Sequence, residues 1–342
     1  MDLPDEPIST RSGPSGDTVI TTFNLCNLFP PSVTPADHDQ GIAQAFVEVQ
    51  VAKLSLAIRQ ELRLPPVIVV QEVGGVEILR RLAAHVNRHA PPGTRYEGIS
   101  LPCSDRRGIE VGFLWDEARC GLSRAWQLEG PRVEAAFGPD SPSPGREPLV
   151  GVFHLNGQEV MIVANHFKSD HVPASLSANK EQMLRVFQAQ RRAQARVVRD
   201  FATQVLTENV AALLMVAGDL NYSPPRTGGD PTNSPLRILA GSGQEPPLAN
   251  LLPLKGEATA YTFRRNGAPE TLDHIFVSEG LRRRFAGIDV LHFNAASPHF
   301  LHIDPSTPRG ASDHDPVEAR FWFAGTVPFP SSPTQVLPAS VW

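Results

Sequence analysis

Val67-Ile-Val-Val-Gln-Glu72 decides the fold class of this chain, because a short apolar run ends here in two polar residues. An apolar run of this kind, without alternation, is typical of a strand buried on both faces of a sheet. Helical spacing of apolar residues precedes it over 40–62, and Pro65-Pro66 end that helix before the strand begins. Residues 74–90 follow with apolar residues three and four positions apart, which predicts a second helix. Helix, buried strand and helix in this order favour an α/β protein.

The rest of the chain continues to alternate strands with helices. Residues 178–208 carry one apolar stripe at helical spacing, which predicts a long third helix. Consecutive strands are expected between residues 95 and 165, so part of the sheet structure should be antiparallel. Pro/Gly-rich residues 131–146 are expected to form a loop. The expected strands lie near 18–25, 67–70, 95–100, 109–115, 121–127, 147–155, 159–165, 211–217, 272–277 and 317–322.

A single layered domain over 18–323 fits these patterns best, although 342 residues are also enough for two domains. Many of the 33 prolines cluster with Gly and Ser near the two ends of the chain. We therefore expect a flexible N-terminal tail over residues 1–17 and a Pro-rich C-terminal tail over residues 324–342.

Composition and charge narrow the class of protein. The formal net charge is −5, from 31 Lys and Arg against 36 Asp and Glu, so a nucleic-acid substrate would need local basic patches or bound metal. The three cysteines show no CxxC spacing of a zinc site. No apolar run approaches the ~20 residues that cross a bilayer, and the first residues lack the order of a secretory signal. We expect a soluble monomer, cytoplasmic as the sequence stands and secreted if a leader was removed.

Polar side chains follow five separate strand-like runs. Because sheets commonly place such strand ends along one edge, these side chains are expected to converge although they are far apart in the sequence. Mg²⁺ takes oxygen ligands and keeps several waters, so the carboxylates and amides among them form a plausible partial metal shell: Glu72, Asn24 and Asp313. The complete set of strand-end groups is Asn24, Glu72, Asn165-His166, Asp219-x-Asn221 and Asp313-His314.

This set suits the hydrolysis of a phosphate ester by water. Such a reaction needs a group that activates water and groups that stabilise charge on the phosphoryl oxygens and the leaving group. Asp219 is expected to orient or deprotonate the water, with Asn221 beside it as a neutral donor to phosphate. His314 flanked by Asp273 has the form of an oriented imidazole, because a carboxylate fixes its tautomer and supports its charge. His166 would supply a second imidazole for phosphate contact or proton donation.

Each of these residues also has an ordinary structural explanation when it is considered alone. Asp219 could start a turn after a buried strand, Glu72 could be a solvated strand end, and a lone His166 is more often structural. The functional interpretation therefore rests on the ordered set. The arginines of the long helix are expected to form a solvated face: Arg185, Arg192, Arg196 and Arg199.

Six short blocks resemble, in order, those of the endonuclease/exonuclease/phosphatase superfamily with the DNase I-like fold, and in style they are closest to its bacterial nuclease-type members. The resemblance spans residues 18–323. It implies a four-layer α/β sandwich with two central mixed sheets flanked by helices, and a Mg²⁺ or Mn²⁺ site around Glu72. The blocks are Thr22-Phe-Asn-Leu-Cys-Asn-Leu-Phe29, Val70-Gln-Glu-Val73, Asn165-His-Phe-Lys-Ser169, Gly218-Asp-Leu-Asn221, Leu272-Asp-His-Ile-Phe276 and Ser312-Asp-His-Asp-Pro316.

The resemblance also implies a role for each matching residue. Glu72 would be the principal metal ligand, with Asn24 and Asp313 near the metal. Asp219 would activate water and Asn221 would contact phosphate. The resemblance further implies a pair formed by Asp273 and His314, and contact of His166 with the scissile group.

One position departs from the pattern of this superfamily, and four positions extend the candidate site. Two residues after the first-strand asparagine the superfamily usually carries an acidic metal ligand, and this chain has Cys26, which affects metal affinity or number or shifts that role to Asn27. Basic or amide residues next to the chemical blocks are the best candidates to bind substrate phosphate. These are Arg107, Lys168, Asn165 and Arg264.

Three functions are compatible with these residues. The first is a metal-dependent phosphodiesterase that cleaves nucleic acid, with DNA favoured. The second is a phosphatase or a phospholipid phosphoesterase with the same core. The third is a non-catalytic binding module, which does not account for an acidic and imidazole set this complete.

Overall fold

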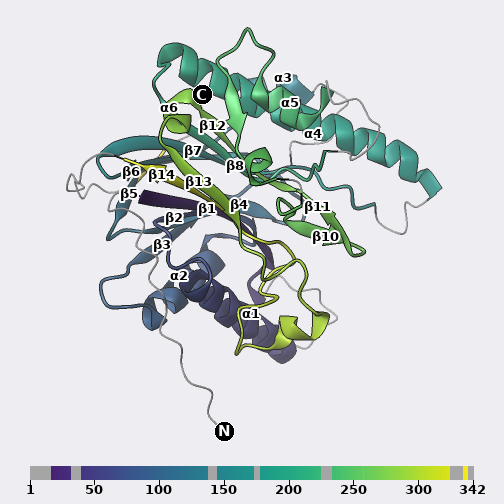
Figure 1. Ribbon diagram of the computed structural model, residues 1–342. Helices are drawn as coiled ribbons and strands as arrows, with labels where there is room; N and C mark the ends of the chain where they lie inside the picture. Colours follow the sequence, from purple (N-terminus) through teal and green to yellow (C-terminus); the bar gives the residue numbers. More distant parts are fainter. Residues whose placement is uncertain are drawn as a thin grey trace.

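The computed structural model describes residues 17–31, 40–137, 145–172, 178–224, 233–256, 258–323 and 334–337. Within these residues the strands form a six-stranded sheet, a seven-stranded sheet and a small hairpin (Figure 1). The six-stranded sheet has the order β13 (Phe285–Val290), β14 (Val317–Trp322), β1 (Asp17–Leu28), β2 (Val67–Val73), β4 (Glu110–Asp116) and β3 (Tyr96–Ser100).

The seven-stranded sheet has the order β15 (Gln335–Val336), β5 (Cys120–Gln127), β6 (Leu149–Leu155), β7 (Gln158–His166), β8 (Leu213–Asp219), β12 (Asp273–Ser278) and β9 (Leu248–Asn250). The hairpin pairs β10 (Phe263–Arg265) with β11 (Ala268–Glu270). The helices are α1 (Gln40–Gln60), α2 (Val76–His89), α3 (Pro131–Phe137), α4 (Lys180–Glu208), α5 (Pro235–Ala240) and α6 (Glu279–Arg282), with 3-10 turns η4 (Leu252–Lys255) and η5 (His299–Ile303).

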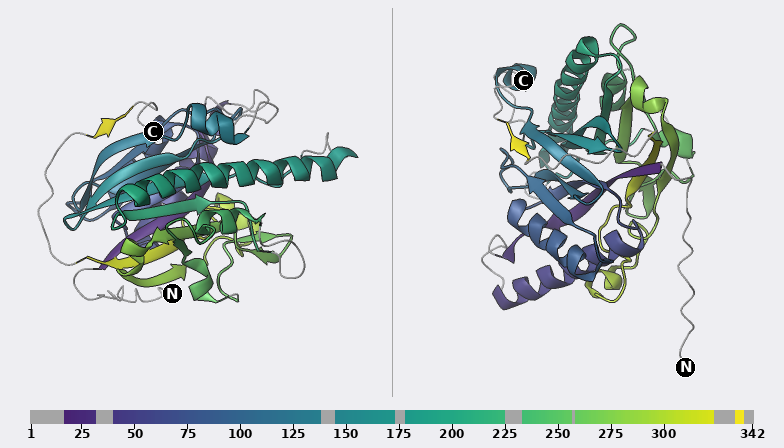
Figure 2. Two further views of the ribbon diagram at one scale, coloured as in Figure 1. Left: turned by 90° about the horizontal axis from the view of Figure 1, so that it is seen from above. Right: turned by 90° about the vertical axis from the view of Figure 1, so that its left-hand side faces the viewer.

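Two sheets face each other and helices cover their outer faces, which confirms the expected four-layer sandwich (Figures 1 and 2). The buried layer between the sheets takes side chains from both, among them Val69 of β2 and Met215 of β8. On the outer face of the six-stranded sheet, α1 and α2 bury apolar side chains, and α4 does the same on the other sheet. In the left view of Figure 2, α4 runs across its sheet and extends beyond it on one side.

Both sheets are mixed, as expected. Strands β1 and β2 run parallel, and so do β7 and β8, whereas β3 with β4 and β5 with β6 are antiparallel pairs. Parallel neighbours end at the same edge, so the carboxyl ends of β1, β2, β7 and β8 bring their terminal polar residues together. Within the described residues, no helix has both the length and the apolar character needed to cross a membrane.

Three details differ from the sequence expectations or extend them. The expected loop 131–146 begins with the short helix α3, because Val133 is buried against the core around α4; residues 138–144 lie outside the described residues. Arg199 is buried rather than solvated, since its guanidinium donates to Leu239 O (3.0 Å) and Pro246 O (2.9 Å). Thr334–Leu337, in the expected C-terminal tail, contains β15, which pairs with β5. The remaining tail residues, 1–16, 324–333 and 338–342, lie outside the described residues.

Candidate active site

The strand register places Asp219 between two other candidate residues. At the end of β8, Asp219 pairs with His166 on β7 and with Asp273 on β12. Gly218 precedes it with φ at 140°, and a Cβ on Gly218 would lie 2.0 Å from the Asn165 carbonyl oxygen. Only glycine therefore allows β7 and β8 to approach closely enough for this register.

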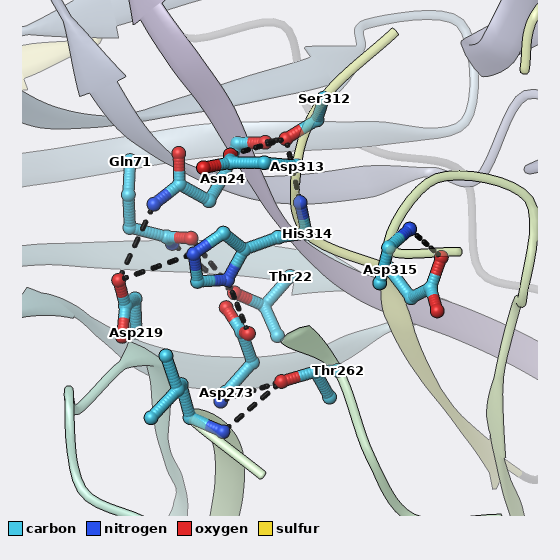
Figure 3. Close-up of polar contacts among 12 residues, drawn as sticks. Thr22, Asn24, Gln71, Asp219, Thr262, Asp273, Ser312, Asp313, His314 and Asp315 are labelled. Atoms are coloured by element: carbon cyan, nitrogen blue, oxygen red, sulfur yellow. Dashed lines mark hydrogen bonds and ion pairs between the residues drawn. The ribbon is translucent and has the colours of Figure 1, made fainter. Parts of the chain in front are cut away.

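The Asp219 carboxylate is the centre of the polar cluster (Figure 3). Its Oδ2 accepts hydrogen bonds from Asn24 Nδ2 (3.3 Å) and Asn221 Nδ2 (3.0 Å), and its Oδ1 accepts one from the Asn221 backbone N–H (2.8 Å). The Nε2 atoms of His166 and His314 lie 3.4 and 3.9 Å from Oδ2. Asn24 reaches this point from the opposite sheet, so the cluster spans the interface between the sheets.

His314 forms the expected pair with Asp273. Its Nδ1 lies 2.7 Å from Asp273 Oδ2, and both side chains are buried. Burial by itself would lower the pKa of His314, but the Asp273, Asp219 and Asp313 carboxylates outweigh it and raise that pKa well above its usual range. The three carboxylates therefore favour the charged form of the His314 imidazole.

His166 has the opposite electrostatic environment. Burial, the nearby Arg146 guanidinium and then the His314 imidazole lower the pKa of His166 well below its usual range. Its Nδ1 has no hydrogen-bond partner in the described part of the chain. The cluster thus contains one neutral imidazole and one charged imidazole on the same carboxylate.

Asp219 itself is perturbed by its surroundings. Burial raises the pKa of Asp219 to about 7, and the neighbouring Asp273 and Glu72 carboxylates add to this rise while the His314 imidazole opposes it. A carboxylate whose pKa is close to neutral can exchange a proton with water in the working pH range.

Glu72 reaches the cluster through a bulge in β2. The register shifts between Gln71 and Val73, and Glu72 has φ at 60°, which is uncommon for a residue with a side chain. Its Oε1 lies 3.7 Å from His166 Nε2, and its Oε2 accepts a hydrogen bond from the Asn27 backbone N–H at 2.9 Å. The unusual backbone conformation at this bulge removes Glu72 from the regular pairing of β2 with β4 and brings its carboxylate close to Asp219.

The donor atoms of Glu72, His166 and Asp219 all lie within 4.8 Å of one another and could hold a metal ion. The Glu72 and Asp219 carboxylates suit Mg²⁺ or Mn²⁺, because these ions prefer oxygen ligands, whereas the His166 imidazole is a nitrogen donor that Mg²⁺ favours less. The Asn24 Oδ1, which accepts from the Cys26 backbone N–H at 2.9 Å, lies at the edge of the same cluster. The two carboxylates therefore fit the divalent ion that the sequence suggests, and His166 lies next to them.

Asp313 and Cys26 lie next to each other at the edge of the polar cluster around Asp219. Asp313 is exposed, and it is not a member of the close donor group formed by the described residues. Burial, followed by the Asp313 and Glu72 carboxylates, raises the pKa of the Cys26 thiol well above its usual range. Cys26 is thus a neutral group between two acids.

The segment that carries Asp313 and His314 is held by two residues of the Ser312–Pro316 block to which the sequence patterns assigned no role. Asp315 is fully buried, and its Oδ1 accepts from the backbone N–H groups of Phe293 (3.2 Å), Asn294 (2.8 Å) and Ala295 (3.0 Å). Ser312 Oγ donates to Asn24 O at 2.7 Å. The available signal in the sequence was an aspartate directly between His314 and Pro316, since a carboxylate that becomes buried there needs several donors.

The four phosphate candidates differ in their surroundings. Arg107 is exposed, and Lys168 is half-buried with its Nζ 4.0 Å from the centre of the Phe187 ring; both lie close enough to His166 to lower its pKa. Arg264 lies over Tyr261, with 4.5 Å from its Cζ to the ring centre, on the β10–β11 hairpin. Asn165 is fully buried and its amide donates to the carbonyls of Val163 and Ala217, so its donors are not free to bind phosphate.

Arg146 is a further cation at the site that the sequence patterns did not indicate. It is buried, its Nε lies 3.3 Å from Asp105 Oδ2, and its Nη1 donates to the Phe167 carbonyl at 3.0 Å. It is the last residue of the Pro/Gly-rich stretch 131–146, whose sequence predicts a loop, where an arginine is ordinarily solvated. Its position beside His166 becomes visible only when β6 and β7 pair.

Comparisons with known proteins agree with this fold. No curated protein matches the chain significantly. A D. rerio TDP2 humanised by 14 mutations is 17% identical with a TM-score of 0.55, over 89% of this chain and 98% of that one. An endonuclease/exonuclease/phosphatase protein from Bacteroides vulgatus is 18% identical with a TM-score of 0.55 over the same shares of the two chains. The human Nocturnin catalytic domain with bound sulfate is 14% identical with a TM-score of 0.54, over 90% and 95%. The model of the Endonuclease/Exonuclease/phosphatase family matches residues 21–314, and the chain belongs to this family.

Proposed function

We propose that this chain is a divalent-metal-dependent phosphodiesterase that hydrolyses nucleic acid by direct attack of water, without a covalent intermediate. The observation that carries the proposal is the Asp219 carboxylate, which contacts both imidazoles and the amides of Asn24 and Asn221. A buried carboxylate beside several hydrogen-bond donors can orient and deprotonate an attacking water and place charge-stabilising groups next to a phosphate.

The proposed roles of the protein groups follow from their charge. Asp219, which is deprotonated when the ion is bound, accepts the proton of the attacking water. The charged His314 donates a hydrogen bond to a phosphoryl oxygen, and Asp273 holds its tautomer. The Asn221 amide, already within hydrogen-bond distance of Asp219, turns to the same phosphate group. The neutral His166 contacts the scissile group from the other side of Asp219.

The Glu72 and Asp219 carboxylates would hold the divalent ion, with Asn24 beside them and Asp313 at the exposed edge of the cluster. When bound, Mg²⁺ or Mn²⁺ supplies Lewis-acid stabilisation of the charge on the phosphoryl and leaving oxygens. The protein side chains around the ion bind and orient the substrate and exchange protons with it.

A polymeric substrate is supported by the distribution of cations. Arg107, Arg146 and Lys168 lie on the His166 side of the cluster, where all three lower the pKa of His166. Arg264 and Arg265 lie on the β10–β11 hairpin, whose Phe263 ring is 4.9 Å from the His314 ring. Positive groups on both sides of the scissile position suit a chain with phosphates on both sides, despite the net charge of −5.

The substrate is tested with the purified chain in Mg²⁺, Mn²⁺ or EDTA. Plasmid DNA, single-stranded DNA, RNA, bis-p-nitrophenyl phosphate, p-nitrophenyl phosphate and sphingomyelin separate the nuclease from the phosphatase and phospholipid alternatives. We expect metal-dependent cleavage of DNA and slower cleavage of the simple diester. Cleavage of the monoester or the lipid alone would replace the nuclease proposal, and no metal-dependent hydrolysis of any substrate by folded protein would reject catalysis.

The site is tested with a matched pair of histidines. His314 and His292 each place Nδ1 within 2.8 Å of a buried aspartate oxygen, but only His314 contacts Asp219. We expect His314→Ala to lower kcat/KM by about 10²-fold or more and His292→Ala to leave it within a few fold. Equal effects of the two substitutions would remove His314 from the mechanism.

A further inference from the structure

Lys53 of α1 is a lysine whose entire side chain is buried beneath the segment leading to Asp313 and His314. It is 1% exposed, and its Nζ donates to the carbonyl oxygens of Asp304, Thr307 and Arg309, each at 2.8 Å. An ammonium group has three protons to donate, so these carbonyls satisfy all of them. Lys53 therefore ties the loop over residues 304–309 to the helix layer (Figure 1, where η5 lies beside α1).

Burial of the Lys53 ammonium group costs free energy, whereas burial of an apolar side chain in the same place would not. Desolvation lowers the pKa of Lys53 below its usual range, and the Asp304 carboxylate opposes this only in part, without a direct ion pair to the ammonium among the described residues. The Asp304 carboxylate instead accepts from the backbone N–H (2.9 Å) and hydroxyl (2.6 Å) of Ser306. The charged ammonium group of Lys53 thus donates to three backbone carbonyls of one loop. These hydrogen bonds hold the loop in a single arrangement.

The loop held by Lys53 continues directly into the active site. After Arg309, the Gly310 N–H donates to Phe293 O at 3.2 Å, and Ser312 Oγ then donates to Asn24 O at 2.7 Å. The same hydroxyl accepts from the His314 N–H at 3.1 Å. The position of the loop therefore decides where Ser312 meets β1 and where the His314 ring lies relative to Asp219.

We propose that Lys53 is a positioning residue, which fixes the 304–309 loop so that Asp313 and His314 stand at the Asp219 carboxylate. It does not touch the reacting groups; it acts through the three carbonyls. The kinetic consequence rests on the proposed phosphodiesterase function, whereas the consequence for the loop does not depend on it.

The test compares Lys53→Met, which removes charge and donors at nearly constant length, with Lys53→Arg, which keeps both. Ser55→Ala is the control, because Ser55 is buried on the same helix and its hydroxyl has no partner in the part of the chain that the structure describes. Two quantities are measured: kcat and KM for bis-p-nitrophenyl phosphate, and hydrogen exchange of amides over residues 304–316 and in β7 and β8.

For Lys53→Met we expect kcat to fall about 10- to 100-fold with KM within about threefold, because a displacement of about 1 Å has this effect on a catalytic group. Exchange over 304–316 should rise at least about tenfold while β7 and β8 stay protected. Lys53→Arg should recover part of both quantities, and Ser55→Ala should behave as the wild type.

Wild-type kcat in folded Lys53→Met, or unchanged exchange over 304–316, would overturn the proposal. If Lys53→Met does not fold, Lys53→Gln keeps two donors without the charge and must show a smaller loss of kcat with faster loop exchange; its failure to do so would also overturn the proposal. If the wild type hydrolyses nothing, the proposed function fails, and the exchange measurement alone decides the role of Lys53.

Discussion

Two imidazoles lie on one carboxylate in this site, and their protonation differs because their neighbours differ. His166 lies beside Arg146, Arg107 and Lys168, so a proton on it is disfavoured. His314 lies among the Asp273, Asp219 and Asp313 carboxylates, which hold a proton on it despite burial. A charged donor and a neutral imidazole can therefore face the same phosphate without competing for one proton.

Asp273 gives this division of charge a testable pH dependence. Because the Asp273 carboxylate raises the pKa of His314, Asp273→Asn should lower that pKa. If the charged His314 is the active form, activity is lost as pH rises through the pKa of His314, so the alkaline limb of kcat/KM should move to lower pH. The measurement is the pH profile on a simple diester, with His292→Ala as the control. An alkaline limb that stays in place would show that His314 does not act as the cation.

Cys26 replaces the acidic residue expected near the metal, and its effect can be measured separately. The thiol lies between the Asp313 and Glu72 carboxylates and stays neutral. Cys26→Asp adds a hard oxygen ligand, so the Mg²⁺ concentration for half-maximal activity should fall about tenfold, equivalent to about 1.4 kcal/mol. Cys26→Ser adds no charge and should leave that concentration unchanged. A midpoint that does not move in Cys26→Asp would place this position outside the metal environment.

At the scale of elements, the end of β8 depends on one glycine. A Cβ at Gly218 would lie 2.0 Å from the Asn165 carbonyl oxygen, and the backbone there has φ at 140°. Gly218→Ala should therefore lower the free energy of unfolding by more than about 3 kcal/mol and displace Asp219 from its place beside His166. Urea unfolding measures the loss.

Gly93→Ala is the control, because Gly93 has φ at 95° and nothing lies close to the added Cβ. This substitution should lower the free energy of unfolding by about 1–2 kcal/mol. A smaller loss at Gly218 than at Gly93 would contradict the close approach of β7 and β8.

Those elements whose signal is local could be predicted from the sequence. The strand that contains Val67–Val70 and the helix α2 form as expected. Their signals, an apolar run and apolar residues at helical spacing, are carried by residues close together in the sequence. The strand-end residues Asn24, Glu72, His166, Asp219 and His314 were found for the same reason. Arg146 and Arg199 were not recognised as buried, because their partners are backbone carbonyls from distant segments. The bulge at Glu72 and the Lys53 contacts likewise exist only once the sheets and helices pack.

For the whole molecule, the site is a junction between the two sheets rather than a feature of either. Glu72 comes from the six-stranded sheet, whereas His166 and Asp219 come from the seven-stranded one. A metal ion held by Glu72 and Asp219 would therefore connect the two halves of the sandwich. Metal binding should therefore appear as stability of the whole fold, not only as activity.

The final prediction uses this coupling. Mg²⁺ at about 100 times its Kd should stabilise the fold by about 2.7 kcal/mol, which is several degrees in Tm, and EDTA should reverse the shift. Glu72→Gln and Asp219→Asn should lose the response, whereas Glu110→Gln, a buried carboxylate outside the donor group, should keep it.

The pH dependence of the response has a definite sign. The folded-state pKa of Asp219 is raised to about 7, so without metal its proton stabilises the fold at low pH and this contribution is lost as pH rises through about 7. Metal binds the deprotonated carboxylate and competes with that proton. The Tm shift caused by Mg²⁺ should therefore be small at pH 6 and larger at pH 8, as measured by thermal unfolding at both values. A shift that is independent of pH, or that persists in Glu72→Gln, would mean that the ion binds elsewhere, because both the carboxylate with the raised pKa and Glu72 belong to this cluster.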